Sequence, residues 1–247
     1  MTEYIQDVFG MNYTQDKSYY ILDCEEDAHV YLGVKEGIKP EEMEADLRKA
    51  EKEGYHFPAE DYVNKIPVKK HDHVLIPAGT VHCSGANTLV LEISATPYIF
   101  TFKMWDWGRV GLDGMPRPTH IDHGISNIQW DRTTSWVENN LIHQEVTVRE
   151  EEGILVERTG LHQREFIDTY RYMLTKPVVC QTSDSVHVLN IIEGEKAVIE
   201  SPTDSFEPFE VHYAETFIIP ASVGSYRINP TGASEGHPVG IIAASVR

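Results

Sequence analysis

Cysteine is scarce in this sequence of 247 residues, which argues against a covalently stapled fold. Only three cysteines are present, Cys24, Cys83 and Cys180, and no two of them form a C-x-x-C pair. An odd number without that spacing indicates neither a disulfide framework nor a thiolate zinc site. We therefore expect reduced thiols.

Long hydrophobic runs are also missing. Hydrophobic residues make up 41% of the chain, but the longest apolar stretches are only as long as a strand. A membrane-spanning helix needs about 20 mainly apolar residues, so none is predicted. The first ten residues, MTEYIQDVFG, hold neither the basic patch nor the apolar stretch of a secretory signal. We therefore expect a cytoplasmic protein.

Basic charge is the third shortage. Lysine and arginine number 21 against 39 acidic residues, which gives a formal charge of -18. The resulting field repels a nucleic-acid backbone or an anionic bilayer over much of the surface, so we expect neither as a partner. A small anionic ligand remains compatible if a local cluster of cations holds it, because charge is screened over about 8 Å at physiological salt.

Strand patterns dominate what is present. Residues 18–34, SYYILDCEEDAHVYLGV, predict two strands joined by a tight acidic turn, which we interpret as a hairpin. Residues 40–54 predict a helix, since Pro40 suits a first turn, its charges match the helix dipole and Gly54 follows the last turn. Strands are expected again up to residue 107, in VLIPAGTVH, TLVLEIS and YIFTFKMWDW.

The second half continues this β pattern. Short strands separated by turns, from RYMLTK to VGIIAAS, are typical of a sandwich or barrel. The halves also share an internal echo, because residues 72–82 align with residues 214–225 and place Pro77 opposite Pro220. In that alignment His82 stands opposite Ser225.

The turn in the first copy of this echo carries a histidine. In Pro77-x-Gly79-x-x-His82, proline and glycine turn the chain sharply, and the next strand opens with the imidazole. This spacing resembles the second sequence motif of the cupins, small double-stranded β-helix barrels that bind a divalent metal with histidines and a carboxylate. The resemblance makes His82 a candidate metal ligand. A histidine that only packs or forms hydrogen bonds is the alternative.

The residues around this turn resemble a narrower family. IPAGTVHCSGANTLVLEIS is followed by FTFKMWDWGRVGLDGMPRPTHI. The order of a P-x-G-T-x-H turn, a strand of the L-L-E type, an aromatic-Asp-aromatic-x-Arg segment and a D-G-x-x-R-x-x-H-I stretch is similar to type I mannose-6-phosphate isomerase. The resemblance covers nearly the whole chain. Members of that family interconvert mannose 6-phosphate and fructose 6-phosphate with one zinc ion.

This resemblance implies an all-β protein made of two cupin-like double-stranded β-helix (jelly-roll) barrels. The N-terminal barrel would span residues 1–125, carry the site and include the helix at about 40–54 as an insertion. A helical connector would cover residues 126–160. The C-terminal barrel, residues 161–247, would have no metal ligands.

The implied zinc site departs from the family pattern. Family members hold zinc with a Gln-x-His pair, a glutamate and the histidine of the turn, which is His82 here. The glutamate position, directly before the strand SYYIL, holds Lys17, and a protonated ammonium cannot ligate zinc. The Gln-x-His pair would lie upstream of TEYIQDVFG. Two interpretations stay open: an N-terminally shortened copy of a longer enzyme, or a relative that has lost catalysis.

Four further site residues follow from the resemblance. Lys103 aligns with a family arginine and is predicted to be catalytic, in an electrostatic or proton-handling role. Glu92 is predicted to be catalytic by orienting a ligand or a substrate hydroxyl. Lys17 and Arg109 are predicted to bind the substrate as part of a phosphate clamp.

Each of these roles has a structural alternative. Lys103 could lie along the barrel wall, Glu92 could form a hydrogen bond in the interior, and Arg109 could form an ion pair with Asp106. Trp105 and Trp107 are expected to pack and to seal the barrel.

The implied function is a sugar-phosphate aldose–ketose isomerase, with a hexose phosphate as the small-molecule partner and one zinc ion as the cofactor. The alternative is a non-catalytic carbohydrate-binding or regulatory protein with two cupin barrels, motivated by Lys17 in the place of a carboxylate. A third hypothesis, a metal cupin with different chemistry, would show an iron-dependent activity. The sequence leaves open whether the chain forms a homodimer.

Overall fold

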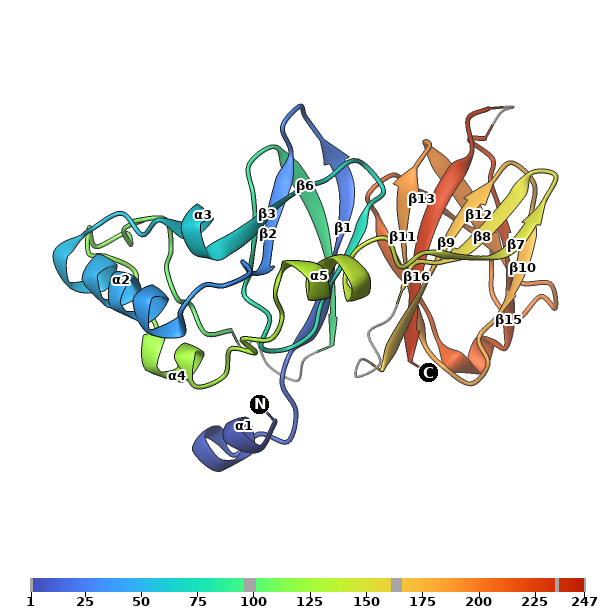
Figure 1. Ribbon diagram of the computed structural model, residues 1–247. Helices are drawn as coiled ribbons and strands as arrows, with labels where there is room; N and C mark the ends of the chain where they lie inside the picture. The colour runs from blue at the N-terminus through green and yellow to red at the C-terminus, as the bar shows by residue number, and fades with distance from the viewer. Residues whose placement is uncertain (1, 96–100, 161–165, 234–235, 247) are drawn as a thin grey trace. The chain divides into compact units, whose positions relative to one another are not determined.

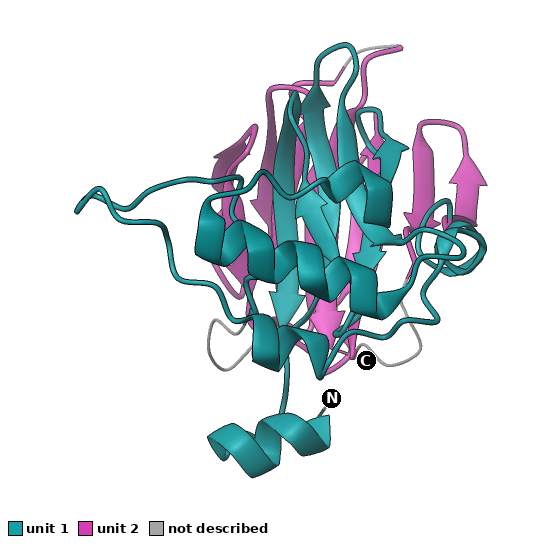
Figure 2. Ribbon diagram, turned by 60° about the vertical axis from the view of Figure 1, so that its left-hand side comes forward, with its two compact units in different colours: residues 1–143 teal, residues 144–247 magenta. Residues whose placement is uncertain are grey.

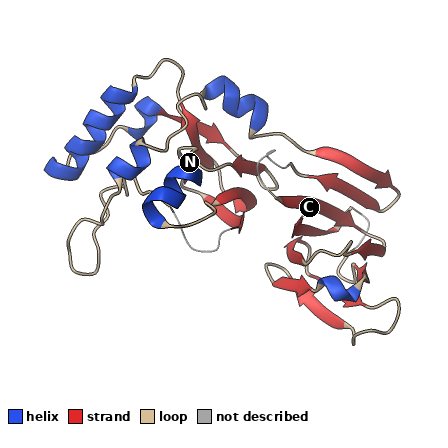
Figure 3. Cartoon of the chain, turned by 90° about the horizontal axis from the view of Figure 1, so that it is seen from below, coloured by secondary structure: helices blue, strands red, loops and turns tan. Residues whose placement is uncertain are grey.

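The computed structural model describes residues 2–95, 101–160, 166–233 and 236–246. The protein divides into two compact units, residues 1–143 and 144–247 (Figure 2). Strands make up most of the regular structure (Figure 3). The α-helices in the described ranges all belong to unit 1, and the helical segment described in unit 2 is a short 3-10 turn. Every helix within these ranges is too short or too polar to span a bilayer.

The described part of unit 1 contains two antiparallel sheets of three strands each (Figure 1). Their orders are β4-β1-β6 and β3-β2-β5. The strands are β1 (Asp16–Cys24), β2 (His29–Val34), β3 (Val63–Pro67), β4 (His73–Ile76), β5 (His82–Ser84) and β6 (Thr88–Ala95).

The hairpin predicted over residues 18–34 is wrong in its pairing. Both strands and the acidic turn form where the sequence predicts them, but β1 and β2 belong to different sheets. Because β4 and β6 pair with the two edges of β1, no edge is left for β2. The turn at residues 25–28, in which Asp27 has a φ of 61°, therefore carries the chain from one sheet to the other.

The predicted helix over residues 40–54 is confirmed as α2 (Pro40–Glu53). Gly54 ends it in the left-handed conformation at a φ of 66°, which glycine adopts without steric cost. Met43 and Leu47 form its buried face. The other helices are α1 (Thr2–Phe9), α3 (Ala59–Tyr62), α4 (Ile121–Ile125) and α5 (Thr134–Asn140), and α4 lies beside α2 (Figure 1).

Unit 2 is also built from two antiparallel sheets, with the orders β14-β11-β16-β9-β8-β7 and β10-β15-β12-β13. A 3-10 turn, η1 (Ala221–Val223), precedes β15. The first two strands lie within residues 126–160, the range of the predicted connector. The strands are β7 (Val146–Glu151), β8 (Ile154–Arg158), β9 (Ile167–Leu174), β10 (Val178–Gln181), β11 (His187–Glu193), β12 (Lys196–Glu200), β13 (Phe209–His212), β14 (Thr216–Ile219), β15 (Ser225–Asn229) and β16 (Val239–Val246).

The two units repeat one arrangement of strands. The order β4-β1-β6 recurs as β14-β11-β16, and β3-β2-β5 recurs as β13-β12-β15. The sequence echo between residues 72–82 and 214–225 is therefore a structural repeat, in which His82 and Ser225 open equivalent strands, β5 and β15.

The pairing register repeats as well. Lys17 pairs with Ile76 in unit 1, and His187 pairs with Ile219 in unit 2. Each isoleucine directly precedes the proline of the aligned turn. Lys17 and His187 consequently occupy equivalent positions in the two units.

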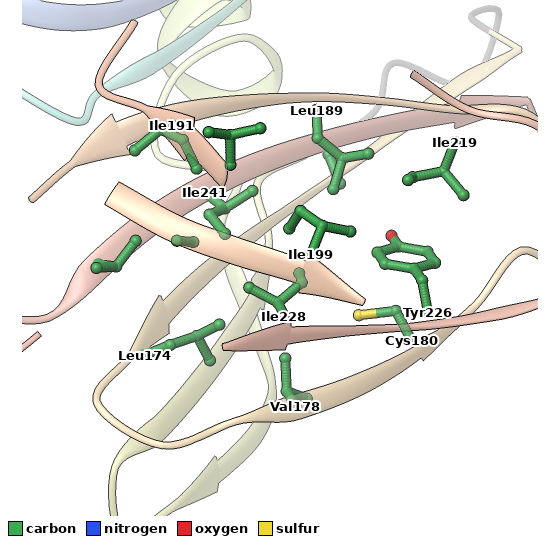
Figure 4. Packing of buried hydrophobic residues seen from close by; sticks show 14 of the residues in the cluster. Leu174, Val178, Cys180, Leu189, Ile191, Ile199, Ile219, Tyr226, Ile228 and Ile241 are labelled. Atoms are coloured by element: carbon green, nitrogen blue, oxygen red, sulfur yellow. The ribbon is translucent and has the colours of Figure 1, made fainter. Parts of the chain in front are cut away.

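The interiors of the two units differ. In unit 2 apolar side chains from both sheets point toward one another, among them Leu189, Ile199, Ile228 and Ile241, none of which is exposed (Figure 4). Unit 1 instead has two smaller clusters, one containing Tyr19 and Ile76 and the other containing Tyr31, Met43 and Phe57. The five residues named from these two clusters of unit 1 also line the cavity described below.

The strand predicted in YIFTFKMWDW does not form over residues 101–107. Its first residues, Tyr98, Ile99 and Phe100, lie outside the described residues. The N–H of Arg109 donates to the carbonyl oxygen of Asp106 at 2.9 Å, which closes a turn, and Trp107 has a φ of 55°. The described residues of this segment pair with no other strand, so they form a loop.

Candidate functional site

Unit 1 contains a cavity of about 420 Å³, within the size range of small-molecule sites. The start of β1, the turn from β4 into β5 and the loop of residues 101–109 all contribute to its wall. Four of the five predicted site residues line it, namely Lys17, His82, Lys103 and Arg109. The fifth, Glu92, is bonded to Lys17.

The turn before His82 is held tightly by its own residues and by β1. Thr80 donates twice to the carbonyl oxygen of Pro77, from its N–H at 3.1 Å and from its hydroxyl at 2.6 Å. A carboxylate oxygen of Asp16 accepts the N–H of Ala78 at 2.7 Å. Gly79 has a φ of 88°, and a Cβ there would lie 2.9 Å from the carbonyl oxygen of Asn127. The glycine of the motif is therefore required both by conformation and by space.

Arg132 is a buried support of this turn that the sequence does not reveal. Its guanidinium, in a residue only 4% exposed, donates to the carbonyl oxygens of Pro77 at 2.7 Å and Ala78 at 2.8 Å, and also to the hydroxyl of Thr80. Arg132 lies in the polar segment WDRTTSW, where no spacing or motif marks it. Arg132 and Pro77 are more than 50 residues apart along the chain, so only the folded structure brings them into contact.

His82 is neutral and has a defined tautomer. Its Nδ1 lies 2.8 Å from the carbonyl oxygen of Thr80, and because a carbonyl only accepts, Nδ1 carries the proton. Nε2 therefore keeps a lone pair. Burial, and then the positive charge of Lys17, lower the pKa of His82 to about 4. The imidazole packs edge-on against the ring of Tyr19, with 6.0 Å between the ring centroids.

Lys17 and Glu92 form an ion pair at this site. The Lys17 Nζ lies 3.1 Å from Oε2 of Glu92, and the side-chain amide of Gln15 donates to Oε1 at 3.1 Å. The Lys17 side chain is only 12% exposed and lies over the ring of Tyr19, 5.4 Å from its centroid. Two residues predicted for different roles, one catalytic and one substrate-binding, thus act as a unit.

Lys103 is held by a second acidic residue. Asp106 accepts from Lys103 at 3.2 Å and from Arg117 at 3.1 Å. Burial alone would raise the pKa of Asp106, but the hydrogen bonds from these two cations outweigh it and hold the pKa below its usual range. The predicted ion pair between Asp106 and Arg109 is wrong, because Arg117 reaches the carboxylate instead. Arg109 remains at the cavity wall.

Aromatic rings form another part of the cavity wall. The ring centroids of Trp105 and Trp107 are 4.7 Å apart, and that of Tyr31 is 5.4 Å from Trp107. Trp105 also packs edge-on against Phe57 at 5.6 Å. Both tryptophans pack as predicted, but Trp107 is 38% exposed and lines the cavity, so it also presents an aromatic surface to a ligand.

In its described residues, unit 2 lacks the polar groups of this site. His187 stands where unit 1 has Lys17, and its Nδ1 lies 2.8 Å from the hydroxyl of Tyr226, a residue with no exposed surface (Figure 4). Ser225 stands where unit 1 has His82. Tyr226 fills the interior next to these positions, so the repeat provides a packed core in place of the wall of a cavity.

The residues present do not fit a zinc ion. A catalytic zinc usually has three protein ligands. Across the described ranges, no three His, Cys, Asp or Glu side chains are grouped so that they could hold a metal ion. His82 offers Nε2, but Lys17 stands at the position that the resemblance assigns to a carboxylate ligand. Glu92, the nearest carboxylate to Lys17, is already bonded to that ammonium.

Comparison with known proteins supports the resemblance seen in the sequence. No protein-family model matches the chain. It is 23% identical over 210 residues to the mannose-6-phosphate isomerase ManA of Bacillus subtilis, which covers 85% of this chain and 60% of that protein. The mannose-6-phosphate isomerase of Streptococcus mutans is 21% identical over 215 residues, with coverage of 85% and 60%. The chain thus spans about 60% of the length of these curated relatives.

Solved structures show the same likeness in the fold. The crystal structure of mannose 6-phosphate isomerase from Bacillus subtilis matches with a TM-score of 0.75 at 19% identity, covering 98% of this chain and 68% of that one. A zinc-bound mannose 6-phosphate isomerase matches with a TM-score of 0.57 at 11% identity, covering 97% and 67%. The chain is therefore similar to the mannose-6-phosphate isomerases in sequence and in fold, as its ordered landmarks predict.

Proposed function

We propose that the cavity of unit 1 binds a hexose phosphate. In this proposal the chain is an aldose–ketose isomerase that interconverts mannose 6-phosphate and fructose 6-phosphate. The observation that carries this proposal is the convergence of Lys17, His82, Lys103 and Arg109 on one cavity in a chain of net charge -18. The names of the curated relatives support it.

The side chains suit the chemistry of such a reaction. Isomerisation moves a proton between sugar carbons 1 and 2 and develops negative charge on the neighbouring oxygens. Lys103, oriented by Asp106, stabilises that charge or handles the proton, and Arg109 binds the phosphate through its planar fork of donors. Glu92 orients the Lys17 ammonium toward the ligand. No step is assigned to zinc, because the described residues do not form its site.

We also propose that each unit is a cupin-like double-stranded β-helix barrel. The support is the shared order of β1 to β6 and β11 to β16 in two facing sheets. In this proposal the N-terminal barrel holds the ligand and the C-terminal barrel does not, because His187 and Ser225 stand at the positions of Lys17 and His82. The domain boundaries at residues 125 and 160, the cytoplasmic location and the homodimer stay predictions.

A second candidate function is carbohydrate binding without catalysis. The observation that favours it is the ion pair of Lys17 with Glu92, at the position that the family resemblance assigns to a metal-binding carboxylate. In this candidate function, a protein with this cavity and without turnover reports the level of a hexose phosphate to a partner.

One pair of measurements separates the two candidates. Calorimetric titration with mannose 6-phosphate measures binding, and a coupled assay for fructose 6-phosphate measures turnover. Binding with turnover that is lost in Lys103→Met and kept in Lys196→Met, a variant in unit 2, supports the isomerase. Binding without turnover of any hexose phosphate supports the binding protein. If the wild type binds neither mannose 6-phosphate nor any other hexose phosphate, the hexose phosphate site that both candidates share is wrong.

A further inference from the structure

Lys17 places a positive charge in the wall of the cavity. It lies on β1, one register step before the turn that carries His82, and shares a strand face with Tyr19. Lys17 and His82 both contact the ring of Tyr19, at 5.4 Å and 6.0 Å respectively. A cation and a neutral imidazole therefore flank one aromatic ring in the cavity wall.

The Lys17 ammonium is held in place by Glu92 and keeps unused hydrogen-bond donors. Glu92 accepts one hydrogen bond from it at 3.1 Å and is itself held by Gln15. An ammonium has three N–H donors, and among the described residues Lys17 makes this one hydrogen bond. The remaining donors are available to a ligand oxygen, and the lone pair on Nε2 of His82 is available to accept from a hydroxyl.

The same arrangement opposes a divalent cation. A metal ion on Nε2 of His82 would be repelled by the ammonium, whose charge already acts on this imidazole. It would also have to compete with Lys17 and Gln15 for the carboxylate of Glu92. A negatively charged or polarised oxygen at the same place is attracted to Lys17.

We propose that the ammonium of Lys17 takes the place of a metal ion in this cavity, so that unit 1 binds its hexose phosphate without a divalent cation. The inference rests on the proposed function only for the identity of the ligand. Lys17 donates to one of two adjacent sugar oxygens, and His82 accepts from the other. Glu92 positions Lys17 and does not ligate metal.

Zinc titration tests the metal half of this inference without any sugar. The probe is zinc in competition with a chelating dye, added to the wild type, His82→Ala, Lys17→Glu and Lys17→Gln. We expect the wild type to bind no zinc that depends on His82, and Lys17→Glu to bind zinc more tightly than Lys17→Gln. One equivalent of zinc in the wild type that is lost in His82→Ala overturns the inference, whatever the sugar measurements show.

Calorimetry with mannose 6-phosphate tests the ligand half. We expect equal affinity in EDTA and in zinc, and a loss of about 10-fold or more in Lys17→Met, because a hydrogen bond from a charged donor is removed. Lys196→Met is the matched control, since Lys196 forms a comparable pair with Glu210 at 2.7 Å on neighbouring strands of unit 2. It should bind like the wild type, and Lys17→Arg should bind more tightly than Lys17→Met.

The outcomes separate the two proposals. Binding that is abolished by EDTA and restored by zinc overturns the inference and leaves the proposed function intact, as does full affinity in a folded Lys17→Met variant. No binding by the wild type in either condition overturns the proposed function together with the ligand half of the inference, and the zinc titration then decides the metal half. Circular dichroism establishes that each variant is folded.

Discussion

Replacing Arg132 by methionine should destabilise unit 1 by about 3 kcal/mol and lower the affinity of its cavity for mannose 6-phosphate. Methionine keeps an apolar stem near the ring of Trp136, which lies 5.4 Å from the guanidinium carbon in the wild type. It removes the donors to Ala78 and Pro77. Pro77 retains Thr80 as a donor, but the carbonyl oxygen of Ala78 loses the one donor it has within the described residues.

The magnitude follows from these contacts. A hydrogen bond from a charged group contributes about 1.5–3 kcal/mol, and an unsatisfied buried carbonyl costs about 1–3 kcal/mol. Relief of the buried guanidinium from its desolvation offsets part of the loss, which leaves about 3 kcal/mol. Because the turn positions His82, affinity for mannose 6-phosphate should fall as well, with Arg132→Lys intermediate.

Urea unfolding followed by tryptophan fluorescence is the assay. All four tryptophans, Trp105, Trp107, Trp130 and Trp136, lie in unit 1, so their emission reports this unit alone. Arg227→Met is the control, because the Arg227 side chain is 41% exposed and forms a surface ion pair in unit 2. This substitution should change the free energy of unfolding measured by tryptophan fluorescence by less than about 1 kcal/mol. A loss in Arg132→Met no larger than in this control would refute the role assigned to Arg132.

Four other predictions follow from the site, three for substitutions and one for pH. Gly79→Ala should destabilise unit 1 by about 2–4 kcal/mol in the same unfolding assay, because of its positive φ and the missing space for a Cβ. Trp107→Ala should lower the calorimetric affinity for mannose 6-phosphate by about 5- to 10-fold through loss of an aromatic contact, and unchanged affinity would contradict this. Asp106→Asn should lower kcat more than it changes KM, since it releases Lys103; equal effects on both would argue for a packing role. The pKa of His82 near 4 lies below its unfolded value of 6.5, so its contribution to stability is complete above pH 6.5 and is lost as pH falls toward 4. NMR titration of the imidazole measures that pKa, and a value near 6.5 would show that His82 is neither buried nor close to Lys17.

Local features of the fold were predictable because they depend on neighbouring residues. Pro40, Gly54 and the spacing of Met43 and Leu47 define α2 without reference to the rest of the chain. The echo between residues 72–82 and 214–225 likewise predicted two copies of one strand arrangement. Strand partners are a different matter, since β1 and β2 have the pattern of a hairpin yet pair with other strands. A period of two along a strand identifies its faces but not its neighbours.

The site was predictable only where a motif carried it. The turn before His82 and the family resemblance around it led to four residues that line one cavity. The partners of those residues could not be inferred, because they lie far away in sequence: Glu92 is 75 residues from Lys17, and Arg132 is 55 from Pro77. The segment YIFTFKMWDW is predicted as a strand because aromatic residues favour strands and the nearest following glycine, Gly108, comes only after Trp107, but its described residues, 101–107, form a loop.

The most direct test of the account is an NMR titration of the wild-type protein with mannose 6-phosphate in EDTA, observing the histidine imidazoles. The account predicts that the resonances of His82 shift as the protein is saturated with ligand. The resonances of His187, which stands in unit 2 at the position of Lys17 in unit 1, should stay in place. Shifts confined to His187, or no shift at His82 at saturating ligand, would contradict the claim that the unit 1 cavity is the hexose phosphate site.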